Sequence, residues 1–419
     1  MRERDDMASA EDSLKAEHPT LDDVRRAAES GAGVIRETPV LSSRTLAQRT
    51  GITVALKAEN LQRTGSFKLR GALAKMAVLT DASHGVVTAS AGNHAQAVAY
   101  AARERRLSCE VFMPQSAPIA KADATTALGA EVHLVGESVD ESLAAARERA
   151  EESRLAFVHP FDDPAVIAGQ GTLGLELVEE IPDLSRVIVP VGGGGLISGV
   201  AIAVKSQLPD VEVIGVQAQA CAPMVASLTA GEPVAVNSAL TIADGIAVKR
   251  PGRLTLELID RWVDDMVAVT EDEVAEAMVF LLERAKLLVE GAGSVGVAAV
   301  LAERIERDDR GTTAVVLSGG NVDPGLLAQI ARRHESQAGR RYVLLARLPD
   351  RPGSLALLLG LIGRLGANVL DVEHIREGFD LHVRESAVQL VLETRGSEHA
   401  EQVRRSVREA GYEKPIVIR

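Results

Sequence analysis

This 419-residue chain is 46% hydrophobic and 25% charged, an ordinary globular composition, and its length predicts two or three domains. The formal net charge of -13 argues against a nucleic-acid or anionic-membrane partner, because no excess of Lys and Arg exists to neutralise phosphates. The two cysteines, Cys109 and Cys221, have no CxxC spacing and the histidines show no HExxH spacing. We therefore predict neither a disulfide framework nor a metal site.

The first stretch of the chain, residues 1–19, is polar and charged, and we expect it to be a flexible N-terminus. It lacks the apolar segment that a secretory signal needs, and no apolar run in the chain reaches the length of a membrane span. We therefore expect a cytoplasmic protein with no membrane partner.

From about residue 20 to residue 337, short aliphatic runs alternate with longer amphipathic ones. Such alternation, with strands that are almost entirely apolar, is typical of an α/β fold with a parallel sheet covered on both faces. The predicted strands are 54–57, 86–89, 110–113, 131–135, 187–190, 213–216 and 314–317. The predicted helices include 93–106, 139–153, 165–180 and 272–286.

The composition changes near residues 332–341, where the segment His334–Gly339 is interpreted as a linker. Residues 341–419 are predicted to form a separate domain, whose elements follow the βαββαβ order of a ferredoxin-like module. The predicted elements are strand 342–348, helix 354–365, strands 368–375 and 387–393, helix 398–410 and strand 416–418.

Lys68, in the segment SFKLRGA (66–72), opens a predicted helix directly after a turn. A positive charge at a helix N-terminus is disfavoured by about 0.3–1 kcal/mol, so a lysine adds little stability there. The same position lowers the pKa of the amine and favours the neutral nucleophile that Schiff-base chemistry needs. Considered alone, a lysine beside a helix start is more often a surface charge.

Four consecutive glycines, 192–195, lie between the apolar strand 187–190 and a predicted helix. Without Cβ atoms in the way, their backbone amides can converge on a dianion at the helix N-terminus. Charge-assisted hydrogen bonds contribute about 1.5–3 kcal/mol each, so several amides outweigh the helix-dipole term. A tight turn is one alternative. A dinucleotide site is another, for which only Asp210 or Glu212 could hold a ribose.

Two further loops carry small or polar residues next to predicted strands. Ser90, Ala91, Gly92 and Asn93 begin a predicted helix, where backbone amides can hold a carboxylate and Asn93 adds a side-chain donor. An N-cap with a turn is the alternative. Ser318 follows the last strand of the body, and hydroxyls at the carboxyl ends of parallel strands face the crevice where such sheets bind ligands. A simple turn serine is the alternative there.

In their joint order, these motifs resemble the threonine dehydratase and serine racemase family of fold-type-II pyridoxal-phosphate enzymes, over roughly residues 20–337. The resemblance implies a tryptophan-synthase-β-like fold with two parallel-sheet subdomains, the small one at roughly 85–160. The last module, with DRPGSL at 350–355, resembles an ACT domain, a family that senses amino acids. The matching motifs are SFKLRGA (66–72), SAGNHAQ (90–96), HPFDDPAVIAGQGT (159–172), PVGGGGLISG (190–199), VEGAG (289–293) and LSGGN (317–321).

The resemblance implies a pyridoxal 5'-phosphate cofactor and a role for each loop. Lys68 would bind the cofactor covalently and then remove the α-proton of an amino-acid substrate. A neutral hydroxyl at the pyridine nitrogen would leave the cofactor a restrained electron sink, which favours loss of the β-hydroxyl over transamination. Phe67 would lie against the cofactor ring, Asn93 would bond its hydroxyl and Ser318 would meet its nitrogen. The phosphate would be held by Gly192, Gly193, Gly194 and Gly195, and the substrate carboxylate by Ser90, Ala91, Gly92 and Asn93.

Two positions depart from the patterns of relatives. Racemases of this family carry an acid–base serine in place of Ala91, and alanine cannot move a proton. Metal-binding relatives use a carboxylate just after the strand that here ends at Gln217, so no magnesium site is predicted. We therefore expect a dehydratase that converts L-threonine to 2-oxobutanoate and ammonia, and L-serine to pyruvate. The alternatives are a serine or hydroxyaspartate dehydratase and, in another class, a non-catalytic amino-acid sensor.

Small sheets of the ACT type tend to pair edge to edge between subunits, and an effector pocket can form at the seam. We therefore expect a homodimer or homotetramer that an amino acid regulates through residues 341–419. A purely oligomerising domain is the alternative.

Overall fold

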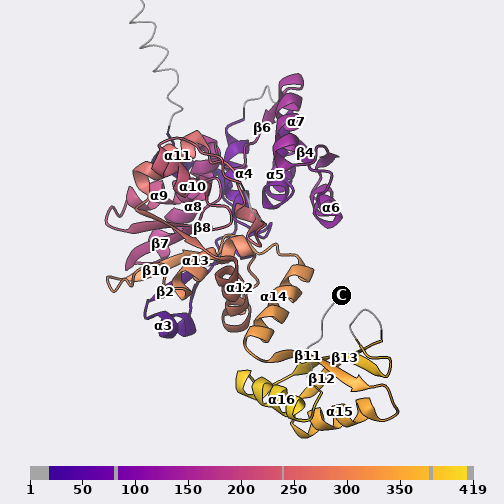
Figure 1. Cartoon of the computed structure of the whole chain (residues 1–419). Coiled ribbons are helices and arrows are strands. Elements are labelled where there is room, and N and C mark those ends of the chain that lie inside the picture. Colours follow the sequence, from indigo (N-terminus) through magenta and orange to yellow (C-terminus); the bar gives the residue numbers. More distant parts are fainter. Residues whose placement is uncertain (1–17, 80–83, 238–239, 377–380, 413–419) are drawn as a thin grey trace, which may run out of the picture. The chain divides into compact units, whose positions relative to one another are not determined.

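The computed structural model describes residues 18–79, 84–237, 240–376 and 381–412. The chain divides into two compact units, Met1–Val322 and Asp323–Arg419 (Figure 1). The first unit holds two separate sheets and the second holds one. None of the described helices is long and apolar enough to span a membrane.

The larger sheet of the first unit is formed by six strands. They are β1 (Val40–Ser42), β2 (Val54–Lys57), β7 (Leu184–Pro190), β8 (Glu212–Ala218), β9 (Asp265–Val269) and β10 (Thr312–Val316). Their order is β1-β2-β10-β7-β8-β9, and only the pairing of β1 with β2 is antiparallel. Val187, Ile188 and Val189 of β7 are fully buried, as expected for a strand with both sheet faces covered. The predicted parallel sheet is confirmed.

The smaller sheet comes from one continuous stretch, residues 85–157. Its strands are β3 (Gly85–Ala89), β4 (Ser108–Met113), β5 (Glu131–Leu134) and β6 (Leu155–Phe157), all parallel and in the order β5-β4-β3-β6. The helices between them are α5 (Asn93–Glu104), α6 (Ile119–Ala127) and α7 (Val139–Glu152). Together the two sheets confirm the α/β fold class with two parallel-sheet parts.

Further helices of the first unit connect and cover the larger sheet (Figure 1). They are α2 (Leu21–Gly31), α3 (Arg44–Thr50), α4 (Lys68–Ala77), α8 (Pro164–Glu180), α9 (Gly195–Lys205), α10 (Pro223–Ala230), α11 (Arg253–Trp262), α12 (Glu271–Phe280) and α13 (Gly291–Leu301). Helices α8 and α9 approach so closely that a Cβ on Gly199 would lie 2.2 Å from the Ile167 carbonyl oxygen. Glycine is therefore required at this crossing.

The second unit begins with α14 (Pro324–Gln337) and contains a three-stranded sheet. The other elements are β11 (Arg341–Pro349), α15 (Ser354–Arg364), β12 (Asn368–Ile375), β13 (Glu385–Glu393) and α16 (Ser397–Glu409). The sheet is antiparallel in the order β11-β13-β12, which is compatible with an ACT-like module. The predicted strand 416–418 lies outside the described residues.

Two boundaries differ from the sequence predictions. The predicted linker His334–Gly339 is wrong for most of its length, because α14 continues to Gln337. Asp323 caps that helix and Ile330 is its one buried residue, a sparse apolar pattern that gave little sign of a helix. The predicted helix 272–286 changes its hydrogen bonding at Leu281, where α12 passes into the π-helical turn η3 (Leu281–Ala285). The short strands β1, β6 and β9 were not predicted.

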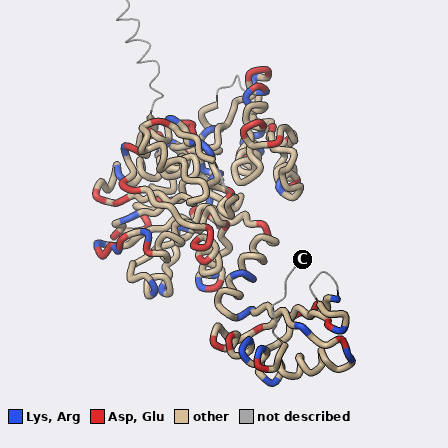
Figure 2. The backbone as a smooth tube through the Cα atoms, viewed as in Figure 1, with Lys and Arg blue, Asp and Glu red and all other residues tan. Residues whose placement is uncertain are grey.

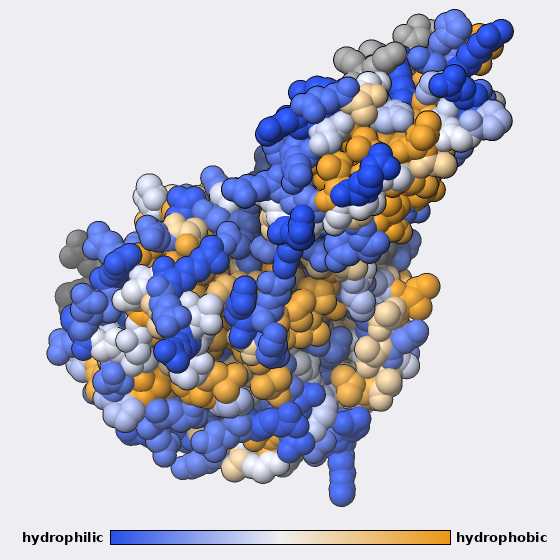
Figure 3. Space-filling view, turned by 90° about the horizontal axis from the view of Figure 1, so that it is seen from below, coloured by the Kyte–Doolittle hydropathy of each residue, from blue (hydrophilic) through white to orange (hydrophobic). Residues whose placement is uncertain are grey.

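The surface mixes charges of both signs with scattered hydrophobic groups. Figure 2 shows acidic and basic residues interspersed along both units. Some of them form ion pairs at the surface, such as Arg25–Asp22 and Arg404–Glu401. On the face in Figure 3, hydrophobic side chains gather in patches between hydrophilic ones. Single exposed hydrophobic residues are normal in folded proteins.

A buried charge network fixes α4 to the sheet and to α8. Arg70 donates to Glu59 through Nε at 2.8 Å and Nη2 at 2.9 Å, and both side chains are almost fully buried. Arg70 also contacts Glu176 at 2.6 Å, and the buried Lys57 contacts that carboxylate at 2.7 Å. Burial alone would raise the pKa of the Glu59 carboxyl, but the charge and hydrogen bonds of Arg70 hold it below its usual value.

Replacing Arg70 with Met is predicted to destabilise the first unit by about 3–5 kcal/mol, because it leaves the buried Glu59 charge without its main partner. Urea unfolding followed by the fluorescence of Trp262, the single tryptophan of the chain, measures the change. The control is Arg253→Gln, which removes an exposed ion pair and is expected to cost less than about 1 kcal/mol. Equal effects of both variants would contradict the prediction.

Candidate functional site

Lys68 is the first residue of α4, and its half-buried amine points towards a backbone carbonyl. Its Nζ donates a hydrogen bond to the carbonyl oxygen of Pro160 at 3.0 Å. Burial lowers the pKa of Lys68 to about 8, although the nearby Glu290 charge acts in the opposite direction. A lysine with a lowered pKa has a larger neutral fraction near neutral pH and is therefore a better nucleophile.

The segment before Lys68 is joined to the end of β10. The amide of Phe67 donates to the Ser318 carbonyl at 3.1 Å, and Gly320 donates to the carbonyl of Gly65 at 2.9 Å. Gly65 has a φ of +74°, so the tight turn before the helix depends on glycine. Ser318 is only 3% exposed, and the pairing brings this predicted site residue beside the predicted Phe67 and Lys68.

The four predicted glycines form the turn between β7 and α9. Gly194 has a φ of +97° and caps α9, which begins at Gly195. The buried amides of Gly193, Gly194 and Gly195 donate no hydrogen bond to any described part of the protein. A Cβ on Gly193 would lie 2.3 Å from the ring of Phe161, and one on Gly192 would lie 3.0 Å from Cα of Ile246. A row of unpartnered amides at a helix N-terminus suits an anion.

Asn93, the first residue of α5, belongs to a chain of three polar side chains. It donates to Oε1 of Glu290 at 2.7 Å and accepts from Nδ2 of Asn321 at 2.8 Å. Glu290 is 5% exposed, and burial followed by the charge of Asp244 raises its pKa to about 8. Lys68 and Glu290 are electrostatically coupled, because the charge of each shifts the pKa of the other.

The other three predicted substrate-loop residues lie between β3 and α5. The Ser90 hydroxyl accepts from the Gly92 amide at 3.1 Å, and Gly92 is the N-cap of α5. Ala91 is half-buried and packs against the core of the smaller sheet. This loop joins the rest of the site through Asn93, whose Nδ2 would lie 3.1 Å from a Cβ on Gly319.

Four residues of the site were given no role by the sequence analysis: Pro160, Phe161, Glu290 and Asn321. All of them belong to motifs that carried the resemblance. The sequence could not identify the partners of these residues, because each contact crosses from one element to another.

Among the described residues, Glu110, Glu131 and His133 also form a group with metal-ligand atoms, but Arg149 donates two hydrogen bonds to Glu110.

Comparisons with known proteins agree on one family. The model described as "Pyridoxal-phosphate dependent enzyme" matches residues 32–319. The L-threonine ammonia-lyase of Thermotoga maritima is 47% identical over 400 residues, which are 95% of this chain and 99% of that protein. The catabolic L-threonine dehydratase of Escherichia coli is 44% identical over 314 residues, 74% of this chain and 95% of that protein. The structure of maize serine racemase has a TM-score of 0.71 at 34% identity, covering 76% of this chain and 98% of that one.

Replacing Glu290 with Gln is predicted to stabilise the cofactor-free protein at alkaline pH. The folded-state pKa of Glu290, about 8, lies above that of an exposed carboxyl, so stability is lost as the pH rises towards 8. The amide does not titrate and keeps an oxygen for the Asn93 hydrogen bond. We expect the variant to exceed the original protein by about 1–3 kcal/mol at pH 9, with the difference lost near pH 5.

Urea unfolding at several pH values, read by Trp262 fluorescence, measures this difference. The matched control is Glu232→Gln, because Glu232 is exposed. A stability difference for Glu290→Gln that stays constant between pH 5 and pH 9 would show that the buried carboxyl does not titrate in this range.

Proposed function

Because the chain belongs to the pyridoxal-phosphate-dependent enzyme family, we propose that it deaminates L-threonine to 2-oxobutanoate and ammonia, and L-serine to pyruvate. Its cofactor is pyridoxal 5'-phosphate. The proposal is carried by the half-buried amine of Lys68, whose lowered pKa suits a nucleophile that is also a base. It is supported by the Thermotoga maritima L-threonine ammonia-lyase, which is 47% identical over 95% of this chain.

The residues of the site fit the chemistry of this cofactor. Its phosphate needs several donors, and the buried amides of Gly193, Gly194 and Gly195 have no protein partner among the described residues. Its aldehyde needs a primary amine, and Lys68 supplies one on a helix whose orientation Arg70 fixes. Gly192 would belong to the same phosphate loop, Asn93 would bond the ring hydroxyl, Ser318 would meet the ring nitrogen and Phe67 would lie against the ring.

When bound, the cofactor withdraws electrons from the α-carbon of an attached amino acid, which makes loss of its α-proton and its β-hydroxyl possible. Lys68 would hold the cofactor through its amine, and the same amine would take the α-proton of the substrate. The buried Glu290 accepts a hydrogen bond from Asn93 at 2.7 Å and holds that side chain in place. A neutral Ser318 hydroxyl at the ring nitrogen would limit electron withdrawal, and this would favour elimination over competing reactions of the α-carbon.

The substrate carboxylate binds at the N-terminus of α5, in the loop Ser90, Ala91, Gly92 and Asn93. No side chain among the described residues caps the 12-residue helix α5, whose first amides can therefore bind an anion. Ala91 cannot return a proton to the opposite face of the substrate, so racemisation is not part of the activity.

We also propose that the protein is cytoplasmic, as the sequence predicts.

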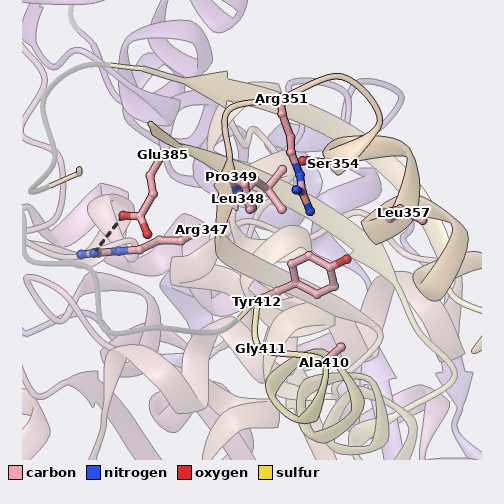
Figure 4. Close-up of a pocket in the computed structure, with 10 residues that line it drawn as sticks. All are labelled: Arg347, Leu348, Pro349, Arg351, Ser354, Leu357, Glu385, Ala410, Gly411 and Tyr412. Carbon is pink, nitrogen blue, oxygen red and sulfur yellow. Dashed lines mark ion pairs between the residues drawn. The ribbon is translucent and has the colours of Figure 1, made fainter. Parts of the chain in front are cut away.

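The second unit regulates the enzyme by binding an amino acid. The Escherichia coli L-threonine dehydratase matches 74% of this chain over 95% of its own length, which argues that the reaction does not need all of the present chain. The unit contains a cavity of about 260 Å³, in which the Arg351 and Tyr412 side chains extend towards each other (Figure 4). Its edge strand β12 exposes Leu370 and Val372, which pairing with a second subunit in a homodimer or homotetramer would cover.

Replacing Lys68 with Arg is predicted to lower L-threonine turnover by at least about 10³-fold, because a guanidinium keeps the charge but cannot bond the cofactor or accept a proton. The visible absorbance of the protein-bound cofactor should disappear as well. The matched control is Lys205→Arg on α9, whose lysine forms an ion pair with Asp264. Appreciable turnover by the Lys68 variant would rule out the proposed role of the amine.

Replacing Arg351 with Ala is predicted to remove the response to an amino-acid effector and to leave basal turnover unchanged. Isoleucine and valine are the first effectors to try, and typical couplings of about 1–3 kcal/mol correspond to changes of about 5–150-fold in affinity. Substrate-saturation curves with and without effector measure the response. Arg364→Ala is the control, because Arg364 lies at the C-terminal end of α15 and does not line the cavity. An undiminished response in the Arg351 variant would place the effector elsewhere.

A further inference from the structure

Residues 159–163 lie between β6 and α8, and four of these five consecutive residues contact other elements of the first unit. The carbonyl of Pro160 accepts from Lys68, and the ring of Phe161 lies against the glycine loop at Gly193. Asp162 accepts from the Thr255 amide at 3.1 Å, in the first turn of α11. Asp163 caps α8 and contacts Lys75 of α4 at 2.6 Å. The first residue of the five, His159, bonds inside the segment itself.

His159 folds this segment through one ring nitrogen. Its Nδ1 accepts from the Asp162 amide at 2.8 Å and from the Phe161 amide at 3.3 Å. An imidazole nitrogen can accept only when it carries no proton, so the ring is neutral with its proton on Nε2. Burial, followed by the charge of Arg147, lowers the pKa of His159 to about 4, and the ring therefore stays neutral at physiological pH.

The two bonds set the direction of the chain on both sides of Phe161. The Phe161 ring meets the His159 ring edge to face, with centroids 4.7 Å apart and an 86° angle. Its ring atoms come within 2.3 Å of the place that a Cβ on Gly193 would occupy, and its carbonyl oxygen is 2.8 Å from the corresponding place at Gly195. One residue earlier, the Pro160 carbonyl meets Nζ of Lys68 at 3.0 Å.

We propose that His159 is a positioning residue, whose Nδ1 acceptor holds the Lys68 amine and the glycine loop at a fixed separation. The consequence for turnover rests on the proposed function, in which Lys68 and that loop bind opposite ends of one cofactor. The Nδ1 lone pair is engaged by two amides, so His159 does not act as a base through that atom. The Nδ1 acceptor of His159 bonds only to amides of the same short turn. Loss of these two bonds would therefore move Pro160 and Phe161 together.

The test compares His159→Asn with His159→Phe. The Asn side chain carries an oxygen where the imidazole has Nδ1, but it loses the aromatic packing. Phe keeps the aromatic packing and loses the acceptor. Two measurements are made: the dissociation constant of pyridoxal phosphate from the cofactor-free protein, by absorbance titration, and kcat and KM for L-threonine.

For His159→Asn, we expect cofactor affinity and kcat within about threefold of the original protein. For His159→Phe, we expect cofactor binding weakened by at least about tenfold, with kcat lowered more than KM is raised. Thermal unfolding of each cofactor-free variant, read by Trp262 fluorescence, checks that the first unit folds. If the Phe variant does not fold, His159→Gln replaces it, because its oxygen lies at the position of Nε2 and the same loss is expected.

Two results would overturn the inference. If the His159→Phe variant keeps its cofactor affinity while the His159→Asn variant loses it, the His159 ring matters only for packing. A folded Asn variant as impaired as the Phe variant would show that an acceptor at the Nδ1 position does not preserve the function, which contradicts the role proposed for that atom. If the original protein releases no 2-oxobutanoate, the proposed function fails, but the cofactor affinities of the variants still decide the role of His159.

Discussion

The proposed site depends on one constraint: the amine of Lys68 is held where burial disfavours its positive charge. Lys68 meets that condition because several chain segments converge at the carboxyl ends of parallel strands. β10 leads to Ser318, β7 to the glycine loop and β3 to the loop before α5. The same convergence buries Glu290, so a lysine with a lowered pKa and a carboxyl with a raised pKa both titrate near 8. Titratable groups whose pKa values are shifted towards the working pH are typical of catalytic sites.

The surroundings of the amine are rigid for reasons separate from the chemistry. Arg70 follows Lys68 by two residues and is bound to Glu59 and Glu176, so the start of α4 cannot turn without breaking buried ion pairs. On the other side, the segment that begins at His159 reaches Lys68, the glycine loop and two helix N-termini within five residues. A reaction that needs an amine and a phosphate site at a fixed separation gains from two such independent supports.

The sequence predicted the elements with strong patterns and missed those without one. The apolar residues of β7 predicted a buried strand, and the glycines after it predicted a tight turn before a helix. Lys68 was correctly predicted to lie at a helix start. Strand β6 has three half-buried residues, and α14 has a single buried one, so neither carried a clear hydrophobic period. The sequence analysis also gave no role to Glu290, for a different reason. Its role depends on Asn93, almost two hundred residues away in sequence, and no local pattern records a contact of that kind.

The most direct measurement is the release of 2-oxo acid by the purified, cofactor-loaded protein given L-threonine or L-serine at equal concentrations. Each product is identified separately, as 2-oxobutanoate from threonine and pyruvate from serine. We expect both products, with the larger kcat/KM for threonine. A bound cofactor with no oxo acid from either amino acid would leave the family assignment in place and contradict the proposed reaction.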